Sequence, residues 1–186
     1  MLSGVDETKR RLAAEPLRGF PDAMGLWLWA LQEVRRDTLK SVAGVDQGTL
    51  DWEGDDATDN TIGSLLYHIG LVEMSWLYLD ILEKELPAEV QEDYPRPMAD
   101  ASGRLARVLE VPLDEHLARL ERSRQLFLEA LTGMTLDDWR RLRDPSGVDY
   151  RVTPEWAVFH LMEHEAGHAY QIRSMKRRAK RFLAGS

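Results

Sequence analysis

Residues 153–182 read TPEWAVFHLMEHEAGHAYQIRSMKRRAKRF and carry the strongest helical signal in the chain. Thr153 is a typical N-cap residue, and Pro154 follows at the first helical position, where proline is favoured. On a helical wheel of about 100° per residue, Ala157, Leu161 and Met175 fall within roughly 60° of His164. A one-sided apolar face is typical of a helix that packs against others. The stretch therefore predicts a long helix over 154–182 whose inner face also carries histidine.

Three further segments show the same periodicity. The second long segment has Thr61 as a candidate N-cap and Pro87 just beyond its end, and the third follows Pro112. Strand signals are almost absent from the chain. We therefore expect an all-α protein, a four-helix bundle, with long helices over 22–42, 62–86, 113–131 and 154–182.

Residues 87–112, between the second and third long helices, differ from the rest in carrying Pro95, Pro97, Gly103 and scattered charges. They predict a long crossover with one short helix at 101–109. Such a connection suits a bundle whose helices do not simply alternate up and down. At 186 residues, the whole chain 1–186 fits one domain, in which residues 1–20 form an N-terminal extension.

The composition excludes several classes of protein. A net charge of −8 argues against a nucleic-acid-binding surface, which needs clustered positive charge. The chain has no cysteine, so disulfides, thiolate metal sites and cysteine nucleophiles are excluded. The start, MLSGVDETKRRLAAEP, lacks the apolar region of a signal peptide, and no stretch approaches the ~18 apolar residues of a membrane span. We expect a cytoplasmic protein that binds neither membranes nor nucleic acid.

Basic residues cluster only near the C-terminus, between Arg173 and Arg181. They could contact an anion or a partner. The preferred interpretation is structural, because positive side chains are favoured at the negative end of a helix dipole.

Histidines lie on the inner faces of two predicted helices. His68 falls in the middle of the apolar stripe of the second helix, and His160, His164 and His168 form one ridge of the fourth. Unpaired imidazoles are costly in an apolar core, because their nitrogens need partners. A histidine pair at i, i+4 on one helix can hold a metal ion, and a third imidazole from a facing helix would complete a three-nitrogen site.

The stretch His164-Glu165-Ala166-Gly167-His168 also spells HExxH, the motif of zinc proteases. We discount a protease, since no glutamate and no histidine follow His168 to supply the third ligand. Glu165 lies about 100° from His164 on the wheel, so it either flanks the metal or meets solvent. If it turns inward, it is the candidate proton acceptor of a catalytic site. His160 should stay outside the ligand set, because positions i and i+8 are roughly 12 Å apart along a helix.

Other residues are open to more than one interpretation. Arg124 interrupts the apolar ridge of the third helix, so it pairs with a buried acid, extends out of the bundle end or reaches an anionic substrate. His116 is one position off that ridge and is expected to be exposed. The tryptophans of the helices are expected to be core residues, among them Trp76 and Trp156, whereas Trp29 could belong to an interface.

Two stretches resemble the DinB/YfiT-like family of metal-dependent four-helix-bundle proteins. They are TIGSLLYHIGLVEMSW at 61–76 and EWAVFHLMEHEAGHAYQI at 155–172, and the resemblance covers roughly residues 20 to 182. In that family one histidine of the second helix and an i, i+4 pair of the last helix bind a metal, positions that match His68, His164 and His168. This chain has Ala169-Tyr170-Gln171-Ile172 where the family usually has Arg-Gly-Gln-Ile, a change that affects local packing more than ligation.

The resemblance also implies a cofactor and partners. It implies one divalent metal ion, with zinc or nickel expected, and a homodimer. Some relatives are thiol-dependent transferases or isomerases, so a small-molecule substrate used with a low-molecular-weight thiol is expected here.

Two functions follow from a three-histidine site. In the first, the protein is a hydrolase or thiol-dependent transferase, and an open metal position lowers the pKa of a bound water or thiol. Ser64, Ser75 and Gln171 would then orient the bound ligand. In the alternative, a non-catalytic dimeric bundle is stapled by the metal or senses it. A closed structural zinc site normally has four protein ligands, so this alternative gains if His160 or Glu165 completes a tetrahedron. Because ligand imidazoles must be neutral, metal affinity should weaken as pH falls toward about 6.

Overall fold

The computed structural model describes residues 12–183, which form helices joined by loops. The described residues form two isolated β-bridges and no strand, so the expectation of an all-α fold is confirmed. Among them, no helix is both long and apolar enough to cross a membrane. The elements are α1 (Asp22–Val42), α2 (Gln47–Leu50), α3 (Ile62–Ser75), a π-helical stretch (Trp76–Ile81), α4 (Ala88–Asp93), α5 (Leu113–Leu131), α6 (Leu136–Arg140) and α7 (Pro154–Leu183).

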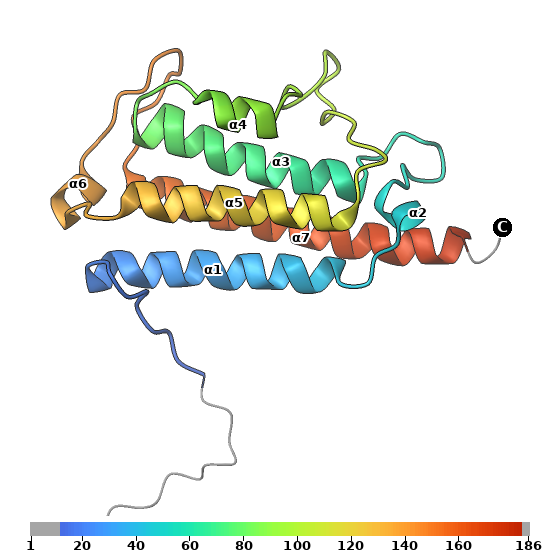
Figure 1. The fold of residues 1–186 in the computed structure, drawn as a ribbon, viewed down its shortest axis with the longest axis horizontal. Coiled ribbons are helices and arrows are strands. Elements are labelled where there is room, and N and C mark those ends of the chain that lie inside the picture. Colours follow the sequence, from blue (N-terminus) through green and yellow to red (C-terminus); the bar gives the residue numbers. More distant parts are fainter. Residues whose placement is uncertain (1–11, 184–186) are drawn as a thin grey trace, which may run out of the picture.

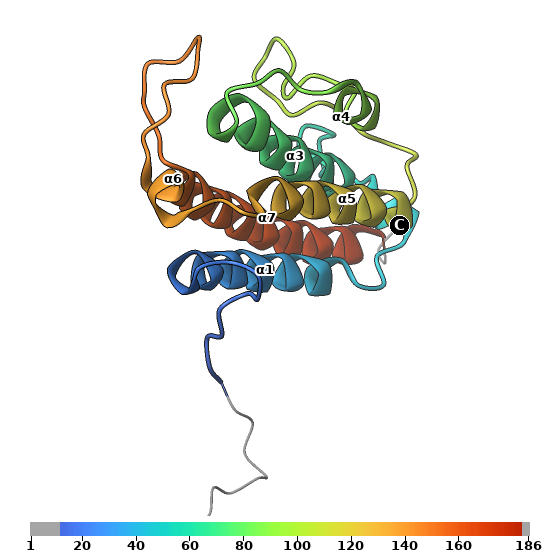
Figure 2. The same ribbon diagram turned by 60° about the vertical axis from the view of Figure 1, so that its left-hand side comes forward.

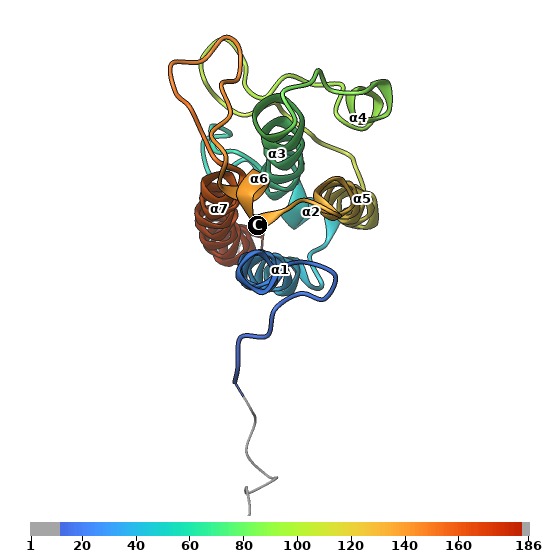
Figure 3. The ribbon, with the colours of Figure 1, turned by 90° about the vertical axis from the view of Figure 1, so that its left-hand side faces the viewer.

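The long helices α1, α3, α5 and α7 lie side by side (Figures 1 and 2). Helix α1 packs against α7, α7 against α3, and α3 against α5. Viewed end-on, the four surround a shared core, and α4 with its flanking loops lies outside α3 and α5 (Figure 3). Helices α1 and α7 run in one direction and α3 and α5 in the other (Figure 1). The long connection between α3 and α5 makes this possible, since it returns the chain to the end from which α3 starts.

The expected boundaries hold for α1, α5 and α7, but not for the second long helix. That helix was expected to reach Leu86 and instead ends at Ile81, after its last turn widens into π-helical bonding. The amide of Leu82 donates to the carbonyl of Leu77, and Glu83 adopts a left-handed conformation with φ of 52°. A residue in this conformation ends a helix, because the following residues cannot continue its hydrogen-bond pattern.

The prediction of a short helix at 101–109 is also wrong. The connection instead contains α4, at Ala88–Asp93, and a tight turn closed by a bridge between Ala99 and Leu105. The Asp100 side chain accepts hydrogen bonds from the amides of Ser102 and Arg104. Aspartate bonds of this kind favour a turn over a helix, because they offer the backbone donors an alternative partner.

Each long helix buries a polar residue in the middle of the core, and the four side chains form what we call the buried ion ring. It consists of Arg35 of α1, Glu73 of α3, Arg124 of α5 and Glu165 of α7, all no more than 5% exposed. Arg35 donates to Glu165 Oε1 at 2.7 Å and to Glu73 Oε2 at 2.9 Å. Arg124 donates to the remaining oxygens, Glu73 Oε1 and Glu165 Oε2. Every carboxylate oxygen therefore has its own guanidinium donor.

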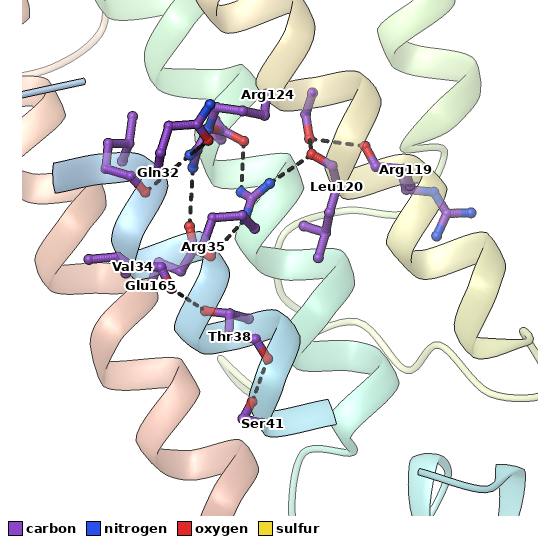
Figure 4. Close-up of polar contacts among 12 residues, drawn as sticks. Gln32, Val34, Arg35, Thr38, Ser41, Arg119, Leu120, Arg124 and Glu165 are labelled. Atoms are coloured by element: carbon purple, nitrogen blue, oxygen red, sulfur yellow. Dashed lines mark hydrogen bonds and ion pairs between the residues drawn. The ribbon is translucent and has the colours of Figure 1, made fainter. Parts of the chain in front are cut away.

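The two arginines also bridge α1 and α5 through the backbone (Figure 4). Arg35 of α1 donates to the carbonyl of Leu120 on α5 at 2.7 Å. Arg124 of α5 donates to the carbonyl of Leu31 on α1 at 3.1 Å and to Gln32 Oε1 at 3.0 Å. The planar, five-donor guanidinium suits this role, because a single group reaches carboxylates and carbonyls at once. Of the three interpretations of Arg124, pairing with a buried acid is the one observed.

The opposite charges of the buried ion ring outweigh the effect of burial on the pKa of Arg35 and Glu73, whereas burial still lowers the pKa of Arg124. Burial alone would raise the pKa of Glu73, but the guanidinium groups of Arg124 and Arg35 outweigh it, so that the pKa is lowered. Conversely, burial would lower the pKa of Arg35, yet the charges of Glu73 and Glu165 raise it. The ring therefore holds two positive and two negative charges, and no net charge is buried.

The basic residues near the C-terminus have structural partners. Arg173 pairs with Asp37 at 2.6 Å, and Arg178 pairs with Asp59 at 2.7 Å. Lys176 donates to the carbonyls of Ser41 and Ala43 at the C-terminal end of α1. A positive charge there stabilises the negative end of the helix dipole and caps free carbonyls. These contacts fit the structural interpretation.

His116 is buried, and the expectation that it is exposed is wrong. Its side chain is 1% exposed because the connection before α5 folds over it: the carbonyl of Val108 and the Nε2 of His116 both lie close to Gly63. Neither ring nitrogen has a hydrogen-bond partner among the described residues. Burial, helped by the charge of Arg119, lowers the pKa of His116 to about 4.

Protonation of His116 should make stability depend on pH. The unfolded chain binds this proton below about pH 6.5, whereas the folded chain excludes it until about pH 4, so stability falls as pH drops through this window. The loss is at most about 1.4 kcal/mol per pH unit. Urea unfolding of metal-free protein at pH 7 and pH 5 should show His116→Leu losing less stability than the wild type. Equal losses in the two proteins would contradict this prediction.

Candidate metal centre

Three histidines from two antiparallel helices, α3 and α7, converge where these helices pack together. His68 is supplied by α3, and His164 and His168 by successive turns of α7. The Nε2 of His164 lies 3.0 Å from the Nε2 of His68 and 3.0 Å from the Nε2 of His168. The three potential ligand atoms all lie within 4.8 Å of one another, and the residues are half-buried. The structure thus brings together the three residues that the sequence singled out.

The spacing of these nitrogens fits one small cation. With Zn–N bonds of roughly 2.1 Å, tetrahedral ligands lie roughly 3.4 Å apart. The observed 3.0 Å separations come within a few tenths of an ångström of this value. Three imidazoles could therefore hold a divalent ion here after a small outward adjustment.

The protonation state of the histidines also fits a metal. Burial and the neighbouring histidines lower the pKa of His164 to about 3, and burial and His168 lower the pKa of His68 to about 4. The pKa of His168 is lowered too, chiefly by burial. Neutral imidazole is the form that binds metal ions. Protons should therefore compete with a metal at lower pH than the value near 6 expected for ordinary histidines.

One hydrogen bond selects the tautomer of His168. Its Nδ1 lies 2.9 Å from the side-chain oxygen of Gln171, one turn further along α7. Because this oxygen only accepts, Nδ1 carries the proton and the lone pair of Nε2 points into the cluster. Such support by a second residue is the usual arrangement around a metal-binding histidine.

Comparison with known proteins identifies the family. A sequence model described as the DinB superfamily matches residues 30–172, which include all three histidines. The chain belongs to the DinB superfamily. It is also similar to a Bacillus subtilis (strain 168) protein named "Uncharacterized protein YkkA", with 30% identity over 159 residues that cover 83% of this chain and 87% of that protein.

Of the other polar residues expected near the metal in this DinB chain, only Gln171 contacts a histidine of the cluster. Ser64 is used at the start of α3, where it bonds to Thr61 and accepts from the amide of Val108 at 3.0 Å. Ser75 is seven residues from His68, which is about 10 Å along the helix. The wheel gives the direction of each serine around the helix axis, but it does not give the neighbours that the side chain meets.

Replacing Gln171 with leucine should weaken metal binding about 10- to 100-fold, because the tautomer and orientation of His168 would no longer be fixed. Competition against a chromophoric chelator measures the effect. Gln125→Leu is a matched control, since that exposed glutamine of α5 donates a hydrogen bond to Glu121 on its own helix and lies outside the histidine cluster. If Gln171→Leu binds the metal as tightly as the control variant does, Gln171 has no role in the metal site.

His160 lies beside the DinB histidine cluster and is not part of it. Its ring centroid is 6.1 Å from that of His164, and its ring stacks on Trp156 with an interplanar angle of 4°. The ring of His160 is also close to that of Trp76, with centroids 4.9 Å apart and an interplanar angle of 52°. These contacts agree with the expectation that His160 stays outside the ligand set.

Glu165 neither meets solvent nor flanks the histidines with a free carboxylate. It is 3% exposed, and its two oxygens accept from Arg35 and Arg124 in the buried ion ring. Sequence reasoning missed its partner Arg35 and also Glu73, the other carboxylate of the buried ion ring. A signal for Glu73 was present, since it is the only charged residue in the otherwise apolar helix IGSLLYHIGLVEMS.

Proposed function

We propose that this chain is a metal-dependent enzyme of the DinB type that binds one divalent ion through His68, His164 and His168. Zinc or nickel is the proposed ion. In this proposal the whole chain acts as one domain, the long helices with their 87–112 crossover are the four-helix bundle of the family, and the protein is a cytoplasmic homodimer.

The observation that carries the proposal is the number of available ligands. Among the described residues, the cluster suited to a metal contains three histidines and no fourth histidine or carboxylate. Of two further candidates on α7, His160 stacks on Trp156 and is not part of the cluster, and Glu165 is held by two arginines. A closed structural zinc site normally has four protein ligands, whereas catalytic sites have three and leave a position for an exogenous ligand.

A metal held in this way acts as a Lewis acid and lowers the pKa of a bound water or thiol. We propose a hydrolase or a thiol-dependent transferase acting on a small molecule. Because the chain has no cysteine, the thiol of a transferase reaction must come from a low-molecular-weight cosubstrate. The role of His68, His164 and His168 is to hold the ion, and the role of Gln171 is to orient His168.

The candidate catalytic role of Glu165 is less favoured than a structural one. A carboxylate whose oxygens both accept from buried guanidinium groups is a poor proton acceptor, because protonation would break the buried ion ring. His160 is the other titratable side chain next to the cluster. The alternative function, a metal-stapled or metal-sensing bundle without catalysis, would be favoured by a fourth protein ligand.

Cobalt(II) substitution distinguishes the two functions. We expect the visible absorption of the Co²⁺-loaded protein to change when acetohydroxamate or 2-mercaptoethanol is added, because an exogenous ligand enters the open position. A response to the thiol would favour the transferase. Stoichiometric Co²⁺ binding without any spectral response to either ligand would indicate a closed site and overturn the proposal in favour of the structural alternative.

A further inference from the structure

A cavity of about 430 Å³ lies where the end of the α3 segment, the 141–153 loop and the start of α7 meet. Three aromatic rings line it, those of Trp76, Tyr150 and Trp156, together with apolar residues that include Leu142 and Val152. Its volume is within the range of small-molecule sites, and such sites are mostly lined by apolar and aromatic side chains. It is separate from the three metal-binding histidines, none of which lines it.

The aromatic residues of the cavity are in contact with one another and yet partly open to solvent. The rings of Trp76 and Tyr150 are stacked at 5.8 Å, and those of Trp76 and Trp156 are 5.7 Å apart. Trp156 remains 48% exposed and Tyr150 39% exposed. Large aromatic surfaces left in water gain free energy when an apolar group covers them.

Specific contacts hold this arrangement in place. The hydroxyl of Tyr150 donates to Asp80 Oδ1 at 2.7 Å, which ties the 141–153 loop to the end of the α3 segment. Trp76 and Asp80 both belong to the π-helical stretch. Short π-helical turns inside helices occur often at functional sites.

A row of rings connects the cavity with the metal centre. Trp156, His160 and His164 are spaced by four residues on α7, so they share one face of the helix. The ring of His160 stacks on Trp156 with centroids 5.3 Å apart and lies 6.1 Å from the ring of His164. From Trp156 to His164 the distance along the helix is roughly 12 Å.

We propose that this cavity binds a neutral aromatic group of the molecule whose polar end occupies the metal. The inference rests on the proposed function and adds the substrate class: an elongated compound with a metal-binding end and a flat apolar end roughly 12 Å away. A cationic end is disfavoured, because the residues lining the cavity include Arg151 and no carboxylate. His160 lies along the path between the two ends and contacts the bound molecule without binding the metal.

Hydroxamates of graded length test this inference on the full-length Co²⁺-loaded protein. Acetohydroxamate gives the affinity of the metal-binding group alone. In a series that starts at benzohydroxamate and lengthens the linker to the phenyl ring one methylene at a time, affinity should rise at least about tenfold at the length that reaches the cavity. Straight-chain alkyl hydroxamates of equal length should gain less, because they cannot stack on the three rings.

Two variants test whether the gain in affinity arises in the aromatic cavity. Trp156→Ala should lose the length-dependent gain while keeping its metal, and its half-exposed position allows replacement without unfolding. Phe159→Ala is the matched control, since Phe159 is a partly exposed aromatic residue of the same helix that packs on Trp27 instead. Circular dichroism and metal content verify both proteins.

The outcomes separate the two proposals. If acetohydroxamate leaves the Co²⁺ absorption unchanged, the proposed function fails first. If acetohydroxamate binds but no linker length improves affinity, or if Trp156→Ala keeps the gain, the aromatic subsite is wrong. If a trimethylammonium tail of matched length gains more than phenyl, the site binds a cation and the neutral class is wrong.

Discussion

Replacement of Glu73 with glutamine is expected to lower the free energy of unfolding by about 3–5 kcal/mol. Glu73 is 2% exposed and accepts from both arginines of the buried ion ring. The substitution preserves size but removes one negative charge, so Arg35 and Arg124 are left with a single carboxylate between them. A buried charge without its partner keeps its desolvation cost and loses the compensating attraction. Urea unfolding at neutral pH measures the loss.

The control for Glu73→Gln is the same carboxylate-to-amide exchange at the surface. Asp93 pairs with Arg122 across a solvent-exposed gap between α4 and α5, with side chains 31% and 48% exposed. Exposed pairs contribute about 0–1 kcal/mol, so Asp93→Asn should change stability little. A loss below about 1 kcal/mol for Glu73→Gln would mean that the ring contributes no more than a surface pair.

Replacement of His164 with alanine is expected to abolish stoichiometric metal binding. His164 is the central residue of the cluster, because its Nε2 lies 3.0 Å from each of the other two. Loss of a direct ligand should weaken affinity by more than the 10- to 100-fold that follows from loss of a supporting hydrogen bond. Elemental analysis after purification without chelators, and chelator competition, measure the effect.

The stability of the folded protein toward heat and denaturant gives a second measure of the loss of metal binding. A ligand present at 100 times its Kd stabilises the folded state by about 2.7 kcal/mol, so wild-type protein should gain stability with added metal and His164→Ala should not. His160→Ala is the control and should keep both the metal and the gain, because its ring is outside the cluster. If His164→Ala keeps the ion and His160→Ala loses it, then His160 is the metal ligand and His164 is not.

Local sequence signals determined where three of the long helices, α3, α5 and α7, begin. Thr61 accepts a hydrogen bond from the amide of Ser64, and Thr153 accepts one from the amide of Trp156, as expected of N-cap residues. Pro112 immediately precedes α5, and Pro154 opens α7. These signals act within one helical turn, so they operate before any tertiary contact. The π-helical end of the second long helix escaped prediction, because its widened turn has no comparable local signature.

The sequence by itself also determined the metal-ligand candidates. The i, i+4 spacing places His164 and His168 on one face of any helix, and the apolar stripe around His68 requires that residue to face inward. The resemblance to the DinB family selected these three among the five histidines. Their convergence within 4.8 Å follows once α3 and α7 pack antiparallel.

Only the tertiary structure decided which residues the other polar side chains meet. Arg35 and Glu165 are 130 residues apart in the chain, and Arg124 and Glu73 are 51 apart. A helical wheel gives the direction of a side chain around its own axis, but not the neighbour that lies there or its height along the bundle. For this reason Glu165 was found between two arginines, and His116 was found under the connection that precedes α5. The aromatic cavity likewise exists only because the 141–153 loop folds back over the ends of two helices.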